Sequence, residues 1–432
     1  MTFIAMLKRG GGRAARAALA ALALALSGAA AAAVHAVAPG ADLAQAIAAA
    51  QDGDVLRLAP GSYAGGIVID KPLTLEGPED RSAVIAGTRQ GRTLWVKAAD
   101  VSLRNLTVTR SGLSLSEMDA GIFLDRTAHR ARVEDNDILD NLVGVHVWGP
   151  EDATVRGNRI VGNKELRVAE RGNGVTLWNT PGTRVLDNDI SAGRDGIFVN
   201  TSKRNTFSGN RFHDLRYAVH YMYTNDSEIS GNVSTHTDVA YAIMYSHRLV
   251  VRGNVALDSR EQGLMLNYAN HSRITDNSVD RAAKCVFIYN ANRNVFRDNQ
   301  FSNCDIGVHF TAGSEGNQIS GNAFINNRNQ VKYVGTRTLD WSVDGRGNYW
   351  SDNTAFDLDG DGIADTAYRP NDVVDQLLWR APAARILLNS PAISIVRWAQ
   401  SQFPAILPGG VLDSAPLMQP PQRSGGRPKE SP

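Results

Sequence analysis

Asparagine recurs at nearly constant spacing through the middle of this 432-residue chain. Successive gaps are 22, 30, 22, 22, 22, 23, 22 and 23 residues, and most of these asparagines follow Gly or Asp. A period this short does not suit a two-helix repeat and is typical of one coil of a parallel β-solenoid. Asparagine tolerates the left-handed backbone of tight turns, and stacked amides can hydrogen-bond from coil to coil. The recurring residues are Asn136, Asn158, Asn188, Asn210, Asn232, Asn254, Asn277, Asn299 and Asn322.

Each coil from Gly121 onward carries a small residue followed by a short run of alternating apolar residues. The pattern predicts an all-β fold, a right-handed parallel β-helix over residues 37–344 with coils of about 22 residues. The second and fourth residues of each run should point into the core, and the third and fifth should point outward. The predicted strand segments are Gly121–Asp125, Gly144–Trp148, Gly174–Trp178, Gly196–Asn200, Ala218–Met222, Ala242–Ser246, Gly263–Asn267, Cys285–Tyr289 and Gly307–Thr311.

The amino-terminal residues 1–36 have the pattern of a signal peptide. Lys8, Arg9, Arg13 and Arg16 precede an apolar, alanine-rich run, and small residues follow it near Ala36. This predicts export to the periplasm, with an uncleaved amino-terminal anchor as the alternative. Residues 42–50 then read as a short helix that caps the first coil and shields its core.

The carboxyl-terminal part of the chain divides into three segments. Residues 345–371 are rich in Asp and Gly, residues 372–418 have a helical pattern that predicts a docking or capping extension, and residues 419–432 have the composition of a disordered tail. In the first segment Asp357, Asp359, Asp361 and Asp365 follow most of the spacing of an EF-hand calcium loop. Tyr368 replaces the final glutamate, so the alternatives are one structural Ca²⁺ or a solvated acidic turn.

Stacking the outward positions brings soft ligands together in three successive coils. His220, Met222, Met244 and Met265 should converge there, with His247 as an alternate ligand just beyond its strand. Thioether and imidazole groups together select Cu(I) over hard cations. The sequence therefore predicts a Cu(I) site, and its alternative is ordinary apolar filler buried beneath the insertion at residues 163–174 or another subunit.

Aromatic residues occupy other outward positions of the same face. Trp148, Trp178 and Phe198 could anchor a protein partner, stack on sugar rings, or form a merely structural aromatic stack. The formal net charge is +1 without a basic stripe, which argues against nucleic acid as a partner. Cys285 and Cys304, a coil apart, could form a disulfide, remain two buried thiols, or bind a metal.

Several stretches resemble the NosD family, within the carbohydrate-binding and sugar-hydrolase-like β-helix superfamily. They are Gly196–Asn232, Tyr241–Asn254, Gly263–Ser272 and the tail Tyr368–Pro404, and the resemblance spans essentially the whole mature chain. It implies a periplasmic, non-enzymatic accessory protein in the maturation of nitrous oxide reductase, a copper enzyme.

The implied partners are an ABC-type permease with its cytoplasmic ATPase, a copper chaperone lipoprotein and the apo-reductase. The ATP chemistry would belong to the ATPase, in keeping with the lack of nucleotide-binding motifs in the chain. Membrane contact would run through the permease, and Leu377, Leu378, Trp379 and Trp398 suit docking onto it. The resemblance does not supply the copper ligands, which rest on the stacking argument.

Two other functions compete with transient Cu(I) handling. A metal-free scaffold would only orient the partners. A polysaccharide lyase or epimerase would need a base and a group that neutralises a uronate carboxylate, for which His220, Tyr221 and Arg248 are candidates. No cluster of outward Asp and Arg residues accompanies these three groups in the predicted stacking.

Overall fold

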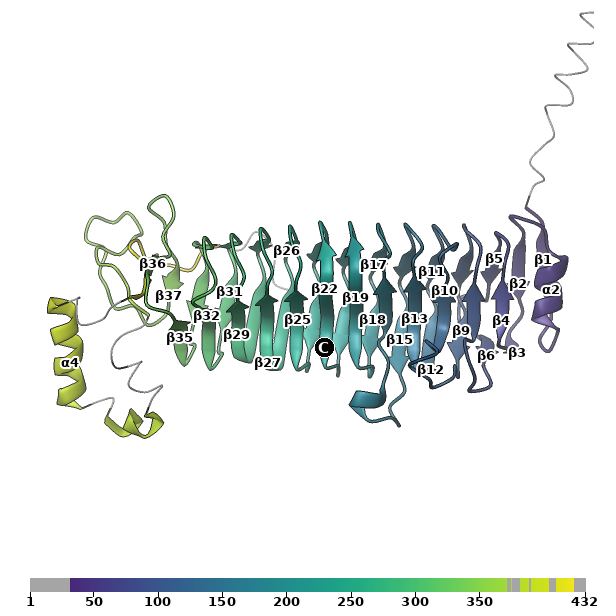
Figure 1. Ribbon diagram of the computed structural model, residues 1–432, viewed down its shortest axis with the longest axis horizontal. Helices are drawn as coiled ribbons and strands as arrows, with labels where there is room; N and C mark the ends of the chain where they lie inside the picture. The colour runs from purple at the N-terminus through teal and green to yellow at the C-terminus, as the bar shows by residue number, and fades with distance from the viewer. Residues whose placement is uncertain (1–31, 371–373, 375–380, 388–389, 404–408, 423–432) are drawn as a thin grey trace, which may run out of the picture.

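The computed structural model is a long parallel β-solenoid whose coils stack along one axis (Figure 1). It describes residues 32–370, 374, 381–387, 390–403 and 409–422. The predicted signal peptide lies almost wholly outside these residues. Strand β1 begins at Val34 and pairs with β2, so the expected boundary at residue 36 falls inside a paired strand.

Three parallel ladders of strands run along the solenoid. The first is a separate sheet made of β1 (Val34–Val37), β2 (Val55–Leu58), β5 (Thr74–Glu76), β8 (Ser102–Arg104), β11 (Arg132–Glu134), β14 (Thr154–Arg156), β17 (Arg184–Leu186), β20 (Thr206–Ser208), β23 (Glu228–Ser230), β26 (Val250–Arg252), β28 (Arg273–Thr275), β30 (Val295–Arg297) and β33 (Gln318–Ile319).

The second ladder carries the predicted strand segments, and we call its outward side the central face. It consists of β4 (Ile67–Ile69), β7 (Leu94–Val96), β10 (Ala120–Leu124), β13 (Val143–Trp148), β16 (Val175–Trp178), β19 (Asp195–Lys203), β22 (Tyr217–Asn225), β25 (Val239–Met244), β27 (Val255–Asn267), β29 (Ser278–Tyr289), β32 (Ile306–Thr311) and β35 (Asn329–Val334).

The third ladder shares the long strands β27 and β29 with the second. Its other members are β3 (Gly61–Ala64), β6 (Ala83–Ala86), β9 (Thr107–Thr109), β12 (Asp137–Asn141), β15 (Arg159–Gly162), β18 (Asp189–Ser191), β21 (Arg211–His213), β24 (Val233–Thr235), β31 (Gln300–Ser302), β34 (Ala323–Ile325) and β37 (Tyr349–Trp350).

The asparagine repeat forms a continuous hydrogen-bonded ladder inside the solenoid. The Oδ1 atom of Asn158 accepts both the backbone N–H and the Nδ2–H of Asn136, each at 3.0 Å. The same pair of bonds repeats coil by coil to Asn348, which adds one asparagine to the predicted series that ends at Asn322. Because these amides are buried, each unmet donor would cost about 1–3 kcal/mol.

The left-handed backbone falls on the residue before each of the nine asparagines of the predicted series. Asp135, Gly157 and Gly209 have φ of 57°, 64° and 68°, whereas the ladder asparagines are absent from the positive-φ residues of the described chain. The stacked amides are therefore as predicted, but the turn conformation is supplied by the preceding Gly or Asp.

Both ends of the solenoid are capped. Helix α2 (Leu43–Ala49) is capped by Asp42, whose side chain accepts from the backbone N–H of Ala44 and Gln45, and the helix buries Leu43 and Ile47 over the first coil. This confirms the predicted capping helix.

The other end is closed by a segment that the helical pattern did not predict. Strand β38 (Gly410–Leu412) pairs with β36 (Thr338–Asp340), and buried Asp413 accepts from the backbone N–H of Asn348 at 2.7 Å, which ends the asparagine ladder. Among the described residues, the helical part of the extension comprises Val374, the 3₁₀ helix η2 (Pro382–Leu387) and helix α4 (Pro391–Gln402).

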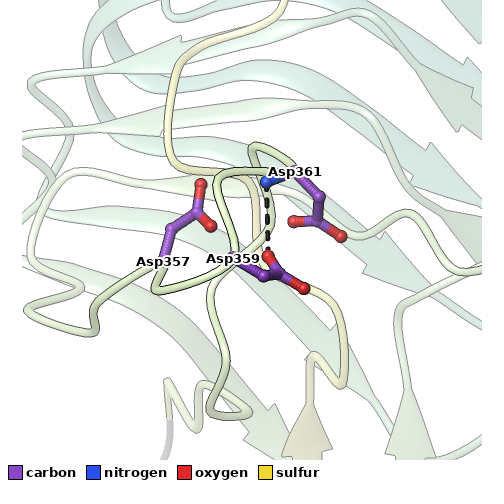
Figure 2. A group of neighbouring side chains, drawn as sticks. All are labelled: Asp357, Asp359 and Asp361. Carbon is purple, nitrogen blue, oxygen red and sulfur yellow. Dashed lines mark hydrogen bonds between the residues drawn. The ribbon is translucent and has the colours of Figure 1, made fainter.

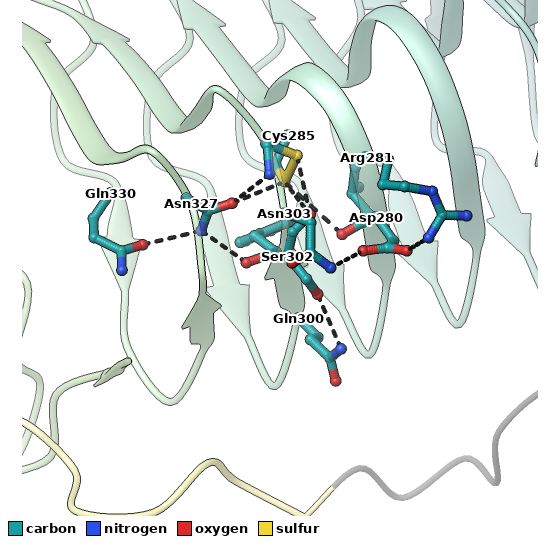
Figure 3. Close-up of a disulfide and its surroundings, with 11 residues drawn as sticks. Asp280, Arg281, Cys285, Gln300, Ser302, Asn303, Asn327 and Gln330 are labelled. Carbon is teal, nitrogen blue, oxygen red and sulfur yellow. Dashed lines mark hydrogen bonds and ion pairs between the residues drawn. A yellow bond between two sulfur atoms is a disulfide. The ribbon is translucent and has the colours of Figure 1, made fainter. Parts of the chain in front are cut away.

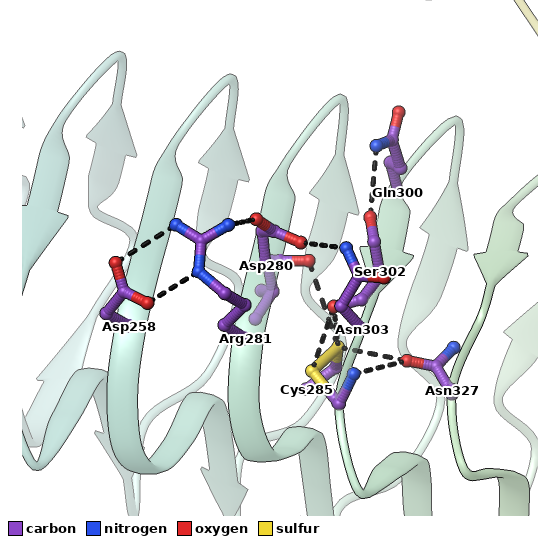
Figure 4. A network of polar contacts seen from close by, with 10 residues as sticks. Asp258, Asp280, Arg281, Cys285, Gln300, Ser302, Asn303 and Asn327 are labelled. Atoms are coloured by element: carbon purple, nitrogen blue, oxygen red, sulfur yellow. Dashed lines mark hydrogen bonds and ion pairs between the residues drawn. A yellow bond between two sulfur atoms is a disulfide. The ribbon is translucent and has the colours of Figure 1, made fainter.

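Cys285 and Cys304 form a disulfide inside the late coils (Figure 3), which decides among the three alternatives. Beside it, Arg281 joins two neighbouring coils by pairing with Asp258 and Asp280, and Asn303 donates to Asp280 at 2.6 Å (Figure 4). Such exposed ion pairs individually contribute little to the folding stability.

Candidate functional site

Two columns of outward side chains run along the central face, one residue per coil. The His column consists of Trp95, Phe123, His146, Thr176, Phe198, His220, Ala242, Met265, Phe287, His309 and Lys332. The Met column lies two residues further along each strand and consists of Trp148, Trp178, Asn200, Met222, Met244, Asn267 and Tyr289.

This register corrects one predicted strand segment. Met244 is aligned with Met222, not with His220, and Ala242 takes the position expected for Met244. Ser246, expected to point outward, is fully buried. The segment was framed two residues late because Ala240 and Ala242 both match the small residue that opens a coil, and alternation alone cannot separate frames that differ by two.

The corrected register arranges the four predicted ligands around a small residue. In the His column Ala242 lies between His220 and Met265, and in the Met column Met222 and Met244 are neighbours. Adjacent coils are about 4.8 Å apart, so four soft donors border one methyl group. Ala242 is fully buried while the four donors are partly exposed. Because the alanine side chain is shorter than those around it, we infer a shallow depression between the four donors.

His220 is held by a charged pair that the stacking argument missed. Its Nδ1 lies 3.1 Å from Oδ2 of Asp195, and Arg216 donates to the same carboxylate at 2.8 and 2.6 Å. Burial opposes ionisation of Asp195, but hydrogen bonds from His220 and Arg216 outweigh it and keep its pKa below the ordinary aspartate value. The 22-residue period aligns Asp195 with Tyr217, which is the one sequence signal that could have indicated this contact.

Aromatic rings enclose the depression. Phe198 and Tyr217 both lie 5.0 Å from the His220 ring, centroid to centroid. Beyond the Met column, the half-buried Tyr245 stacks between the exposed Tyr223 and Tyr268, with ring centroids 5.1 Å apart in each pair, and all three residues have positive φ. The site therefore combines partly exposed soft donors with aromatic neighbours.

His247, the predicted alternate ligand, lies elsewhere. The turn at Tyr245 and buried Ser246 separate it from the central face. Its Nδ1 lies 3.3 Å from Nδ2 of Asn270, and the Oδ1 of Asn270 is already engaged by Asn292. Asn270 therefore donates to Nδ1, so neutral His247 carries its proton on Nε2 and is poorly prepared to bind a metal through that atom.

Two other histidines of the His column differ from His220. His146 is 5% exposed, its ring lies 5.0 Å from that of Phe123, and neither ring nitrogen has a partner among the described residues. Burial, together with the positive charge of Arg92, lowers the pKa of His146 to about 4. Burial and two nearby lysines likewise lower the pKa of His309 to about 4.

The predicted partner-binding residues fall into two groups. Trp148 and Trp178 stack at 4.1 Å and 17°, and Phe198 lies one coil further in the His column. Because each indole covers one face of the other, these two faces cannot stack on sugar rings. In the second group, Trp398 on α4 is 63% exposed, while Leu377, Leu378 and Trp379 lie outside the described residues.

The acidic loop gathers three of its four predicted carboxylates. One oxygen from each of Asp357, Asp359 and Asp361 lies within 4.8 Å of the others (Figure 2). Asp365 instead accepts from the backbone N–H of Leu358 at 2.8 Å. Carboxylate oxygens at this separation fit one hard cation such as Ca²⁺.

The three groups proposed for a lyase do not converge. Tyr221 is fully buried in the core, where burial raises the pKa of its hydroxyl far above the ordinary value. Arg248 is paired with Asp226 beyond the turn that ends the central face. His220 is therefore the one member of this set that lies on the central face.

Comparison with known proteins places this geometry in a family context. The family model described as "Periplasmic copper-binding protein (NosD)" matches residues 156–355. A protein named "Probable ABC transporter binding protein NosD" from Stutzerimonas stutzeri is 40% identical over 84% of this chain and 86% of its own length. One of the same name from Pseudomonas aeruginosa is 39% identical over 84% of this chain and 88% of its own length.

Solved structures resemble the chain in fold alone. The N-terminal fragment of bacteriophage Phi29 gene product 12 aligns with a TM-score of 0.54 at 11% identity, covering 70% of this chain and 68% of the fragment. Among the described residues, no helix has the length and apolar character needed to cross a membrane.

Proposed function

Because this chain belongs to the NosD family, we propose that it is a periplasmic accessory protein that receives Cu(I) and passes it to apo-nitrous oxide reductase. The observation that carries the proposal is the ring of His220, Met222, Met244 and Met265 around Ala242. The copper donor would be a chaperone lipoprotein, and an ABC permease with its cytoplasmic ATPase would provide the membrane platform. The chain itself would perform no enzymatic step.

The chemistry of the depression supports a transient cargo. Three thioethers and one imidazole form a soft donor set without net charge, which favours Cu(I) over Ca²⁺ or Mg²⁺. An open and shallow site lets a partner's thioether or imidazole approach before the first ligand leaves, so that copper moves by ligand exchange. A closed site would hold copper more tightly and release it slowly.

Two surfaces support docking of partners. Trp148, Trp178 and Phe198 lie beside the copper depression, where an anchored chaperone or reductase would face it. At the other end, α4 exposes Ile395 and Trp398 at 64% and 63%, an apolar surface suited to the permease. We predict that Leu377, Leu378 and Trp379 belong to the same docking segment.

We further propose that Asp357, Asp359 and Asp361 bind one structural Ca²⁺. Asp357 accepts backbone N–H groups of Gly360 and Gly362 at 2.7 and 2.9 Å, which orders the loop around the three carboxylates. The cation would offset the repulsion among these like charges and fasten the loop to the end of the solenoid.

Cu(I) binding to the isolated mature chain tests the main proposal. A chromophoric chelator would compete with the wild-type protein, with the alanine variant of His220, Met222, Met244 and Met265, and with Met418→Ala as a methionine control in the carboxyl-terminal segment. We expect binding by the wild type and the control, and none by the fourfold variant.

The other outcomes separate the competing functions. Absence of binding by the wild type would overturn the copper site and leave a scaffold that orients its partners. Equal binding by the fourfold variant would overturn the ligand assignment. Turnover of an alginate or pectin oligomer by the purified chain would overturn the non-enzymatic role.

A further inference from the structure

Asp195, the first residue of strand β19, is unusual because its carboxylate is almost wholly buried. It is 2% exposed at the start of β19, and its backbone N–H donates to Oδ1 of Asn173 at 3.3 Å. Asn173 lies near the end of the insertion at residues 163–174. The insertion thus helps to fix the backbone of Asp195 in the coil before His220.

The hydrogen bonds of this carboxylate determine which nitrogen of His220 carries the proton. Arg216 donates to both oxygens of Asp195, at 2.8 and 2.6 Å, and a guanidinium is always a donor. The carboxylate is therefore an acceptor toward its third partner as well. Since Nδ1 of His220 lies 3.1 Å from Oδ2, Nδ1 must donate, and the neutral ring keeps its lone pair on Nε2.

The ring is also held from its sides. The Tyr217 ring meets the His220 ring edge to face, with centroids 5.0 Å apart, and the Arg216 guanidinium lies 4.3 Å from the Tyr217 ring centroid. Arg216 therefore contacts both the Asp195 carboxylate and the Tyr217 ring. Among the described residues, no group hydrogen-bonds to Nε2 of His220. This nitrogen is not fully buried, whereas both ring nitrogens of His146 are buried without a partner.

We propose that Asp195 is a positioning residue, clamped by Arg216, that presents the Nε2 lone pair of His220 to the methionine side of the depression. The assignment of Nε2 to copper rests on the proposed function, whereas the orientation and tautomer of the ring do not. Outer carboxylates of this kind raise the basicity of a ligating imidazole and fix its direction, and their loss typically costs about 10–100-fold in metal affinity.

The decisive variant is Asp195→Asn, which has the same shape. Arg216 would claim the single amide oxygen, so the amide NH₂ would face His220 and force Nδ1 to become an acceptor. His220 should then carry its proton on Nε2, as in other carboxylate-to-amide changes beside a histidine. Asp226→Asn is the matched control, because the Asp226 carboxylate accepts two hydrogen bonds from Arg248 across coils and, among the described residues, no histidine ring hydrogen-bonds to it.

The first measurement is ring ¹⁵N NMR of the copper-free mature chain labelled at histidine, with the His220 signals assigned by their loss in His220→Gln. We expect the Nδ1–H tautomer in the wild type and in Asp226→Asn, and the Nε2–H tautomer in Asp195→Asn. An Nε2–H tautomer in the wild type would overturn the inference, and this readout remains available if Asp195→Asn fails to fold.

The second measurement is Cu(I) affinity of the same proteins. A loss of about 10–100-fold in Asp195→Asn, with Asp226→Asn unchanged, would support the positioning role. An unchanged affinity together with a switched tautomer would show that His220 does not bind copper through Nε2. That result would overturn the ligand role of His220 in the proposed function while leaving the tautomer assignment standing.

Discussion

The central coils and the amino-terminal coils share the same two outward columns, but their histidines differ in hydrogen bonding and burial. His220 has a carboxylate at Nδ1 and an Nε2 that is not sealed, whereas His146 is buried among Phe123 and Trp148 without a partner among the described residues. The strands and their register are the same in both regions. This difference shows that the solenoid fixes the position of each side chain, while neighbouring residues in adjacent coils fix its hydrogen bonds and its solvent access.

The largest expected effect lies in the central coils. Met222→Leu combined with Met244→Leu keeps the volume and removes two thioethers, so the reductase should receive no copper above background in cells. The paired change Trp148→Leu with Trp178→Leu should leave Cu(I) affinity of the purified chain unchanged. Normal copper loading of the reductase with both methionines replaced would remove the distinction between the two regions.

A second change tests the depression without touching a ligand. Ala242→Leu should place three extra carbons where His220 and Met265 approach, and so weaken Cu(I) binding markedly. The solenoid should remain folded, since an overpacked position typically costs about 1–3 kcal/mol. Thr176→Leu, at the equivalent position near the tryptophans, is the control in the same chelator competition and should bind copper as the wild type does.

The amino-terminal histidine should instead affect stability against pH. The folded pKa of His146 is about 4 against an ordinary 6.5, so between these values the unfolded chain binds a proton that the folded chain does not. Stability is therefore lost as pH falls from 6.5 toward 4, by up to about 3 kcal/mol from this group.

His146→Phe removes that penalty. Its melting temperature should exceed that of the wild type more at pH 5 than at pH 7.5, and Cu(I) affinity should not change. An equal difference at both pH values would mean that His146 is not held neutral in the folded protein.

The smallest expected effect lies outside both regions, in the acidic loop. Chelation of Ca²⁺ should lower the melting temperature slightly and increase proteolysis near Asp357, because the three carboxylates then repel one another. Asp359→Asn should respond less to added Ca²⁺ than the wild type. A copper affinity that changed with Ca²⁺ would contradict the independence of the loop from the central coils.

Much of the candidate site follows from the repeat. Once the period is known, His220, Met222 and Met265 fall on one face, and the structure places them there. Met244 was assigned to the wrong column because two alanines fit the start of its coil. Asp195 and Arg216 were missed because their contact with His220 depends on side-chain direction across coils, which a linear pattern does not contain.

The sequence by itself determined the solenoid, its coil length and its stacked asparagines, because a period of about 22 residues with alternating apolar positions can bury its core in few other ways. Only the tertiary structure decided which histidine is presented and which is sealed, how Asp413 ends the ladder, and that Cys285 pairs with Cys304. These outcomes depend on contacts between residues about a coil or more apart. Their geometry exists only after the coils have stacked.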